Sequence, residues 1–180
     1  AEGFEAGGHN GREETTTLTL IPQVRRATDL PVVAAGGIGS GDAMLAAMAL
    51  GAEGVQIGTL FALSAESSAS EAFKQRCLAL DEGGTMLCLK KLSPTRLVRN
   101  GLFDKVAEAE ARGANAEELR DILGKAASKR GIFEGDTEQG ELEIGQIASS
   151  VDAIRPAGEI VRQLVENFRK AQKDVAAIGF

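Results

Sequence analysis

Short apolar runs alternate with glycine-bearing turns and amphipathic stretches over the first 80 residues of the chain. Residues 30–35 form an apolar run that predicts a strand buried on both faces, and residues 54–57 predict a second buried strand. Residues 42–50 carry apolar side chains at helical spacing, and a further helix is expected over residues 67–80. Strands and helices that alternate in this way are typical of a parallel sheet with helical crossovers.

Capping residues and the first residues of the chain refine this picture. Ser40 is the predicted N-cap of the helix over residues 42–50, and Gly51 is its predicted stop. Residues 18–27 predict a helix or a loop ahead of the first strand. The chain starts like the end of a strand that enters a loop, without an initiator Met or a leader, so we expect a piece of a longer protein.

The pattern changes after about residue 81. Residues 85–90 predict a short strand, and residues 102–112 predict a helix. Asn115 is the predicted N-cap of the next helix, because Glu118 stands three positions on and completes a capping box. We expect that helix to end at Gly131.

These elements predict an α/β fold in three parts. Residues 1–80 supply βα units of a parallel sheet, and residues 81–146 form a helical lid or cap. Residues 147–180 form helices that pack back on the main body, with a break at Pro156. Two βα units and a strand end are too few to close a barrel.

Charge and composition exclude several classes of function. The net charge of −6 argues against broad nucleic-acid affinity, which needs clustered Lys and Arg. No apolar run approaches the roughly 20 residues of a membrane span. Cys77 and Cys88 fit no metal-ligand spacing, and one histidine cannot complete a zinc site, so no metal is expected. We expect buried free thiols and a cytoplasmic protein.

The glycine-rich segment near the start holds the only histidine of the chain, His9, among Gly7, Gly8 and Gly11. Glycines let a ligand approach the main chain closely. Histidine exchanges protons most readily near neutral pH and is therefore the usual general acid or base. A lone histidine in a loop is more often structural, so its assignment to catalysis depends on the motifs that follow.

Two glycine-bearing strand ends carry the clearest chemical signal. Gly36 and Gly37 follow the first predicted strand, and Gly58 and Thr59 follow the second. Backbone N–H groups at the carboxyl ends of parallel strands can bind an oxyanion, and the last strands of (β/α)8 barrels commonly bind phosphate there. One Gly-Gly pair alone can be a tight turn, but two such ends one βα unit apart predict a flavin or sugar phosphate site. No Gly-x-Gly-x-x-Gly motif opens a helix here, so a dinucleotide fingerprint is not indicated.

The chain resembles the nitronate monooxygenase (2-nitropropane dioxygenase) family, which also contains flavin-dependent enoyl-ACP reductases. The resemblance extends over essentially the whole chain. The segments that carry it are residues 2–11, 20–24, 31–38, 49–52, 54–59, 134–136 and 145–146. It implies the C-terminal part of a TIM-like (β/α)8 barrel with a helical lid.

The resemblance also implies roles for individual residues. His9 corresponds to the active-site histidine beside the flavin ring. The residues implied in FMN binding are Glu2, Gly8, Gly36, Gly37, Gln56, Gly58 and Thr59. Of these, the glycines at 36, 37 and 58 and Thr59 would hold the phosphate, Gln56 would lie against the cofactor, and Glu2 and Gly8 would approach the ring. Gly145 and Gln146 resemble the element that returns from the lid toward the pocket.

Three functions stay open from the sequence. The first is FMN-dependent oxidation of alkyl nitronates by O2. The second is an enoyl-ACP reductase that uses NAD(P)H, for which a basic patch of Lys90, Lys91, Arg96 and Arg99 could receive acyl carrier protein, although a solvated face explains the patch more simply. The third is a catalytically silent fragment. A small-molecule substrate and a homodimer are the expected partners, and neither nucleic acid nor membrane is expected.

Overall fold

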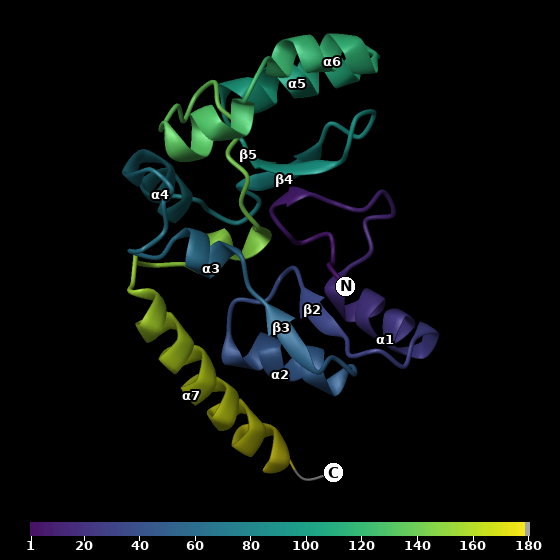
Figure 1. The fold of residues 1–180 in the computed structure, drawn as a ribbon, viewed down its shortest axis with the longest axis vertical. Helices are drawn as coiled ribbons and strands as arrows, with labels where there is room; N and C mark the ends of the chain where they lie inside the picture. Colours follow the sequence, from purple (N-terminus) through teal and green to yellow (C-terminus); the bar gives the residue numbers. More distant parts are fainter. Residues whose placement is uncertain (179–180) are drawn as a thin grey trace.

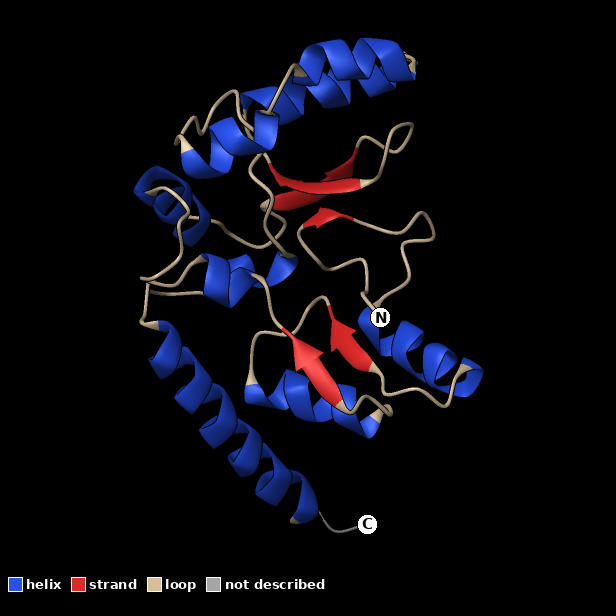
Figure 2. Cartoon of the chain, viewed as in Figure 1, coloured by secondary structure: helices blue, strands red, loops and turns tan. Residues whose placement is uncertain are grey.

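The predicted parallel strands form the lower half of the molecule in the computed structural model, which describes residues 1–178 (Figures 1 and 2). Strand β2 (Val33–Ala35) pairs in parallel with β3 (Gly54–Gln56). Glu2 bridges Ala35 in parallel on the other side of β2. The first residues of the chain therefore do run as a strand end beside β2, as the sequence predicts. Barrel closure is not shown by the residues that the structure describes.

Helices α1 (Thr17–Ala27) and α2 (Gly41–Ala49) pack against one face of this sheet. Ser40 caps α2 as predicted, since its Oγ accepts a hydrogen bond of 3.1 Å from Ala43 N. The core between helices and sheet is built from small and aliphatic side chains. Its buried members are Ile21, Val32, Ala34, Ile38, Ala47 and Ala52.

The predicted burial of the two strands is only partly correct, because Val33 of β2 and Gln56 of β3 are exposed. Val33 is 46% exposed, whereas Ala34 is fully buried. Val33 lies beside Gly54 of β3, which has no side chain to cover it. The helices that form the core lie on the Ala34 side alone.

Helix α7 (Ala157–Ala176) returns to the parallel half and packs along α2 (Figure 1). Gly41 lies at this contact, because a Cβ there would stand 2.1 Å from Phe168 N. The helix begins after Pro156, which confirms the predicted break. The glycine thus lets the two helices approach closely.

The upper half is a mixed α/β lid, not the helical lid that the sequence predicts. Strands β4 (Thr85–Cys88) and β5 (Thr95–Val98) form an antiparallel hairpin. Strand β1 (Gly8–His9), expected to be a loop, pairs with β5 and completes a three-stranded sheet in the order β1-β5-β4. The glycine-rich start of the chain is therefore a structural part of the lid.

Helices α5 (Gly101–Ala111) and α6 (Ala116–Leu123) cover this sheet. The capping box of Asn115 and Glu118 is present as predicted. The predicted end of α6 at Gly131 is wrong, because Gly124 adopts φ +66° and terminates the helix earlier. A short π-helical turn, η1 (Lys129–Phe133), follows.

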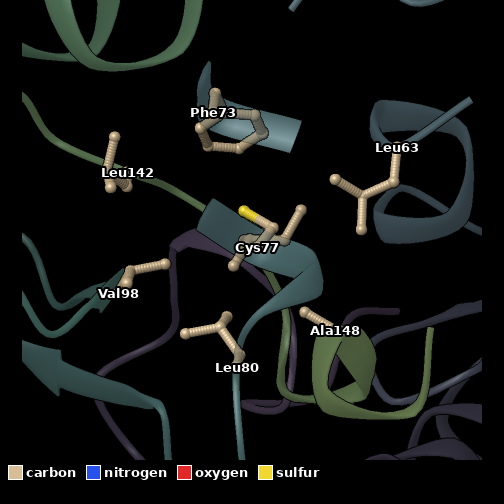
Figure 3. Close-up of a cluster of buried hydrophobic side chains, with 8 residues drawn as sticks. Leu63, Phe73, Cys77, Leu80, Val98, Leu142 and Ala148 are labelled. Atoms are coloured by element: carbon tan, nitrogen blue, oxygen red, sulfur yellow. The ribbon is translucent and has the colours of Figure 1, made fainter. Parts of the chain in front are cut away.

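A second core joins the lid to the return segment (Figure 3). It involves α4 (Glu71–Leu78), shorter than the predicted helix over residues 67–80, and the 3-10 turn η2 (Gln146–Ser150). The short helix α3 (Thr59–Ala62) precedes α4. The buried members of this core are Leu63, Phe73, Cys77, Leu80, Val98, Leu142, Ile144 and Ala148. Within residues 1–178, no helix is long and apolar enough to cross a membrane.

Both cysteines are buried free thiols, as the sequence predicts. Burial raises the pKa of Cys77 and of Cys88 to about 12. Because the thiolate is the reactive form, we expect labelling by a thiol reagent at pH 8 to be on the order of 1,000-fold slower in the folded protein than in urea. Mass spectrometry of timed samples measures this, and prompt labelling of either cysteine in the folded state would contradict it.

Candidate functional site

A cavity of about 250 Å³ lies where β2 and β3 end, between the parallel half and the lid. Six of the residues predicted to bind a cofactor line it. They are Glu2, Gly36, Gly37, Gln56, Gly58 and Thr59. The structure thus brings together two strand ends that are about one βα unit apart in the sequence. The cavity is smaller than the roughly 300–1,000 Å³ typical of a whole-ligand pocket, so it matches one end of a large ligand.

Thr59 and the neighbouring main chain offer hydrogen-bond donors to this cavity. Thr59 Oγ1 accepts a hydrogen bond of 3.1 Å from Gly145 N, which leaves its own proton free to donate. Within the described part of the chain, the backbone N–H groups of Gly37, Gly58 and Thr59 donate to no protein acceptor. A cluster of donors without acceptors fits an oxyanion such as a phosphate.

Three of the glycines that line the cavity, at positions 36, 37 and 58, differ in why the structure needs a glycine there. Gly58 has φ −91°, and a Cβ there would meet nothing within 4 Å, so its lack of a side chain keeps the cavity open. Gly37 adopts φ +72°. At Gly36 a Cβ would stand 2.5 Å from Gly3 O. Gly36 therefore serves the close packing of two chain segments, besides lining the cavity.

Glu5 holds the wall of the cavity that comes from the start of the chain. Its carboxylate accepts hydrogen bonds of 3.1 Å from both Thr17 N and Thr17 Oγ1. Its backbone oxygen accepts a hydrogen bond of 2.9 Å from Gln146 N. Together with the bond from Gly145 to Thr59, this contact confirms that residues 145–146 return from the lid to the pocket.

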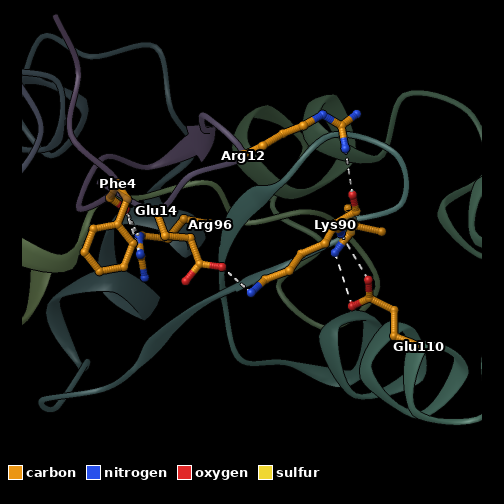
Figure 4. Close-up of polar contacts among 7 residues, drawn as sticks. Phe4, Arg12, Glu14, Lys90, Arg96 and Glu110 are labelled. Atoms are coloured by element: carbon orange, nitrogen blue, oxygen red, sulfur yellow. Dashed lines mark hydrogen bonds and ion pairs between the residues drawn. The ribbon is translucent and has the colours of Figure 1, made fainter. Parts of the chain in front are cut away.

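Arg96 of β5 ties the lid to the first loop (Figure 4). Its side chain is buried, and its Nε and Nη2 donate hydrogen bonds of 3.2 and 2.7 Å to Phe4 O. The guanidinium lies 5.2 Å from the centroid of the Phe4 ring, within the range of a cation–π contact. Burial lowers the pKa of Arg96, and the charges of Glu5 and Glu14 oppose that shift.

One residue of the predicted basic patch is buried, and the other three are exposed. Arg96 is buried, Lys90 pairs with Glu14, and Lys91 Nζ donates to the backbone oxygens of residues 113 and 114. Arg99 is exposed as well, and among the described residues its side chain has no such contact. This arrangement agrees with the simpler interpretation of the patch as a solvated face, and acyl carrier protein as a partner stays a prediction.

His9 and Gly8 do not line the cavity in the described structure. His9 is exposed on β1, opposite Thr95. Gly8 is buried, and a Cβ on it would stand 2.6 Å from Glu143 Oε2. Glu143 does line the cavity, but the sequence analysis did not find it because only the fold brings it beside Gly8. The catalytic role of His9 stays a prediction.

Comparisons with known proteins show the family of the chain. The profile of the family described as nitronate monooxygenase matches residues 1–167. A nitronate monooxygenase from Neurospora crassa is 30% identical over 199 residues, which covers 99% of this chain and 50% of that protein. A probable nitronate monooxygenase from Staphylococcus saprophyticus is 36% identical over 144 residues and covers 73% of this chain and 41% of that protein.

Two solved structures extend the comparison to the fold. The structure of FabK from Thermotoga maritima superposes with a TM-score of 0.91 at 36% identity, over 98% of this chain and 55% of that one. The nitroalkane oxidase from Streptomyces ansochromogenes superposes with a TM-score of 0.76 at 34% identity, over 97% and 52%. The chain spans about half the length of these relatives. It belongs to the nitronate monooxygenase family, whose members are flavin-dependent oxidoreductases.

Proposed function

We propose that the protein binds FMN with the phosphate in the cavity at the ends of β2 and β3, and that it oxidises alkyl nitronates with O2. The observation that carries the proposal is the donor cluster of Gly37, Gly58 and Thr59 at an opening that Gly58 leaves clear. The family match supports the flavin and the nitronate substrate.

The residues of this chain would bind and orient the cofactor and handle one proton. When bound, FMN would supply the electron transfer, and the protein would supply binding, orientation and electrostatics. Thr59 and the free N–H groups would fix the phosphate, and Glu5 would hold the loop that forms the facing wall. Where the neutral nitroalkane is the form that reaches the site, His9 would take the proton from its α-carbon and so form the nitronate.

A reductase function is the second candidate, because FabK, an enoyl-ACP reductase, has the TM-score of 0.91. NAD(P)H would then be the co-substrate. Oxygen uptake with propyl nitronate and NADH consumption with a crotonyl thioester separate the two candidates. Oxygen uptake alone supports the proposal, NADH consumption alone overturns it in favour of the reductase, and activity on neither substrate leaves the catalytically silent form.

Replacing His9 by alanine tests its role as proton handler. With the neutral nitroalkane as substrate, we expect turnover to fall on the order of 100-fold, because a positioned general acid or base contributes about that much or more. FMN binding should not change, since His9 does not line the cavity. Turnover and flavin absorbance are measured on the same sample. Normal turnover of His9→Ala would remove His9 from the mechanism.

A further inference from the structure

Ser128, beside the cavity, bridges two glutamates. Its Oγ lies 2.9 Å from Glu141 Oε2 and 2.7 Å from Glu143 Oε1. A serine hydroxyl has one proton to donate, and an ionised carboxylate has none. If both glutamates were ionised, one of the two contacts would set lone pairs against lone pairs. When one carboxyl carries a proton, it can donate to Ser128 Oγ while Ser128 donates to the other carboxylate, so that each contact has a proton of its own.

We propose that Glu141 and Glu143 share one proton through Ser128 and that this bridge delivers it to the cavity. Glu143 is the member of the pair that lines the cavity, and Glu141 lies behind it. The shared proton is argued from the two contacts of Ser128 together with the partial burial of Glu141 beside a second carboxyl. Its delivery to a substrate rests on the proposed function.

The surroundings of the pair favour a proton on Glu141. Glu141 is half-buried, and burial is the main cause that raises its pKa, with a further increase from the charge of Glu143. The hydrogen bond from Ser128 and the charges of His9 and Arg130 oppose this shift. Cys88 of β4 lies within the electrostatic range of Glu141, and its raised pKa leaves the thiol neutral.

The transfer requires only the movement of protons. The O–H bond on Glu141 breaks as one forms on Ser128 Oγ, and the original Ser128 O–H bond breaks as one forms on Glu143. Every electron pair stays on its oxygen, so no oxidant or reductant takes part. Glu143 then gives the proton to a basic atom of the substrate, and solvent reprotonates Glu141, which is half-buried.

His9 acts on this pair through its charge, although it does not line the cavity. The imidazole is exposed on β1 and does not line the cavity, yet its charge acts on Glu141. Gly8 leaves the space next to Glu143 free of a side chain, because a Cβ there would collide with Oε2. Ser128 and Glu141 are thus positioning residues, and Glu143 is the group that faces the substrate.

A carboxyl titration followed by ¹³C NMR tests the shared proton without flavin. In the unmodified protein we expect one carboxyl of the pair to titrate above the usual range of a glutamate. Glu143→Gln should lower the pKa of Glu141 toward that range, because the charge of Glu143, one cause of the raised pKa, is gone. The matched control is Glu138→Gln, an exposed glutamate of the same segment, which should leave the pair unchanged. Two ordinary, independent titrations in the unmodified protein would overturn the shared proton.

The pH profile of turnover tests the delivery. We expect Ser128→Ala to lower turnover about 100-fold, the lower end for a positioned acid or base, and to remove the limb of the profile that reports the pair. Ser128→Thr should restore both, since it keeps the hydroxyl. An unchanged profile in Ser128→Ala with FMN bound overturns the delivery while the proposed function stands. Failure to bind FMN refutes the proposed function, and with it the delivery, while the NMR titration still decides the shared proton.

Discussion

Replacing Gly58 by leucine is expected to abolish FMN binding while the fold stays intact. Gly58 has an ordinary backbone conformation, with φ −91°, and a Cβ there would meet nothing within 4 Å. The leucine side chain would therefore enter the cavity without strain in the protein. We expect the affinity for FMN to fall at least about 100-fold, which corresponds to about 2.7 kcal/mol. Flavin fluorescence titration measures the affinity, and circular dichroism checks the fold.

Gly11→Leu is the matched control for this change. Gly11 is also exposed, and a Cβ there would have only Glu13 Oε2 as a neighbour, at 3.6 Å. It lies outside the residues that line the cavity. FMN affinity should be unchanged in Gly11→Leu. Equal affinity in Gly58→Leu and in the unmodified protein would place the cofactor elsewhere.

Replacing Arg96 by alanine is expected to cause the largest loss of stability. Arg96 is 2% exposed, and it alone among the described side chains donates to Phe4 O. Alanine would leave that oxygen without its donor and would open a space under the Phe4 ring. A lost partner of a buried polar group and a cavity together cost about 3 kcal/mol or more. Urea unfolding of both proteins measures the difference in free energy.

Arg99→Ala serves as the control, because it removes the same charge from an exposed side chain of the same lid. Surface changes of this kind alter the free energy of unfolding by about 0.5 kcal/mol or less. Similar losses in the two variants would mean that the contact between Arg96 and Phe4 does not hold the loop. An Arg96→Ala protein with the same free energy of unfolding as the unmodified protein would lead to the same conclusion.

Local patterns were sufficient to predict the parallel half of the fold. The apolar runs around Ala34 and Val55, the cap at Ser40 and the glycines at the strand ends all act through neighbours close in sequence. The structure then places these strand ends side by side, because residues 33–35 and 54–56 pair in parallel register. The predicted cofactor residues at those ends therefore meet in one cavity.

The lid was predicted less well, because its structure depends on contacts between distant segments. Strand β5 is four residues long and follows Pro94, so its pattern alone resembles a break. It becomes a strand through pairing with β4 and with Gly8 and His9. Arg96 looked like a surface charge for the same reason, since its partner Phe4 is 92 residues away.

Glu143 and Ser128 were missed because no sequence motif marks them. The two residues lie on different segments of the lid, 15 positions apart, and only the folded chain brings their side chains together. The acidic character of residues 141–143 is visible in the sequence. The role that we propose for these carboxyls depends on their burial and on the single hydroxyl between them, and neither can be seen in the sequence.

The affinity of the protein for FMN compared with that for riboflavin tests the central claim most directly. The two flavins differ only in the phosphate, which we place against Thr59 and the free N–H groups of the strand ends. Each hydrogen bond to a charged group contributes about 1.5–3 kcal/mol, so two of them predict that FMN binds on the order of 100-fold or more tightly than riboflavin. Equal affinities for the two flavins would contradict the account.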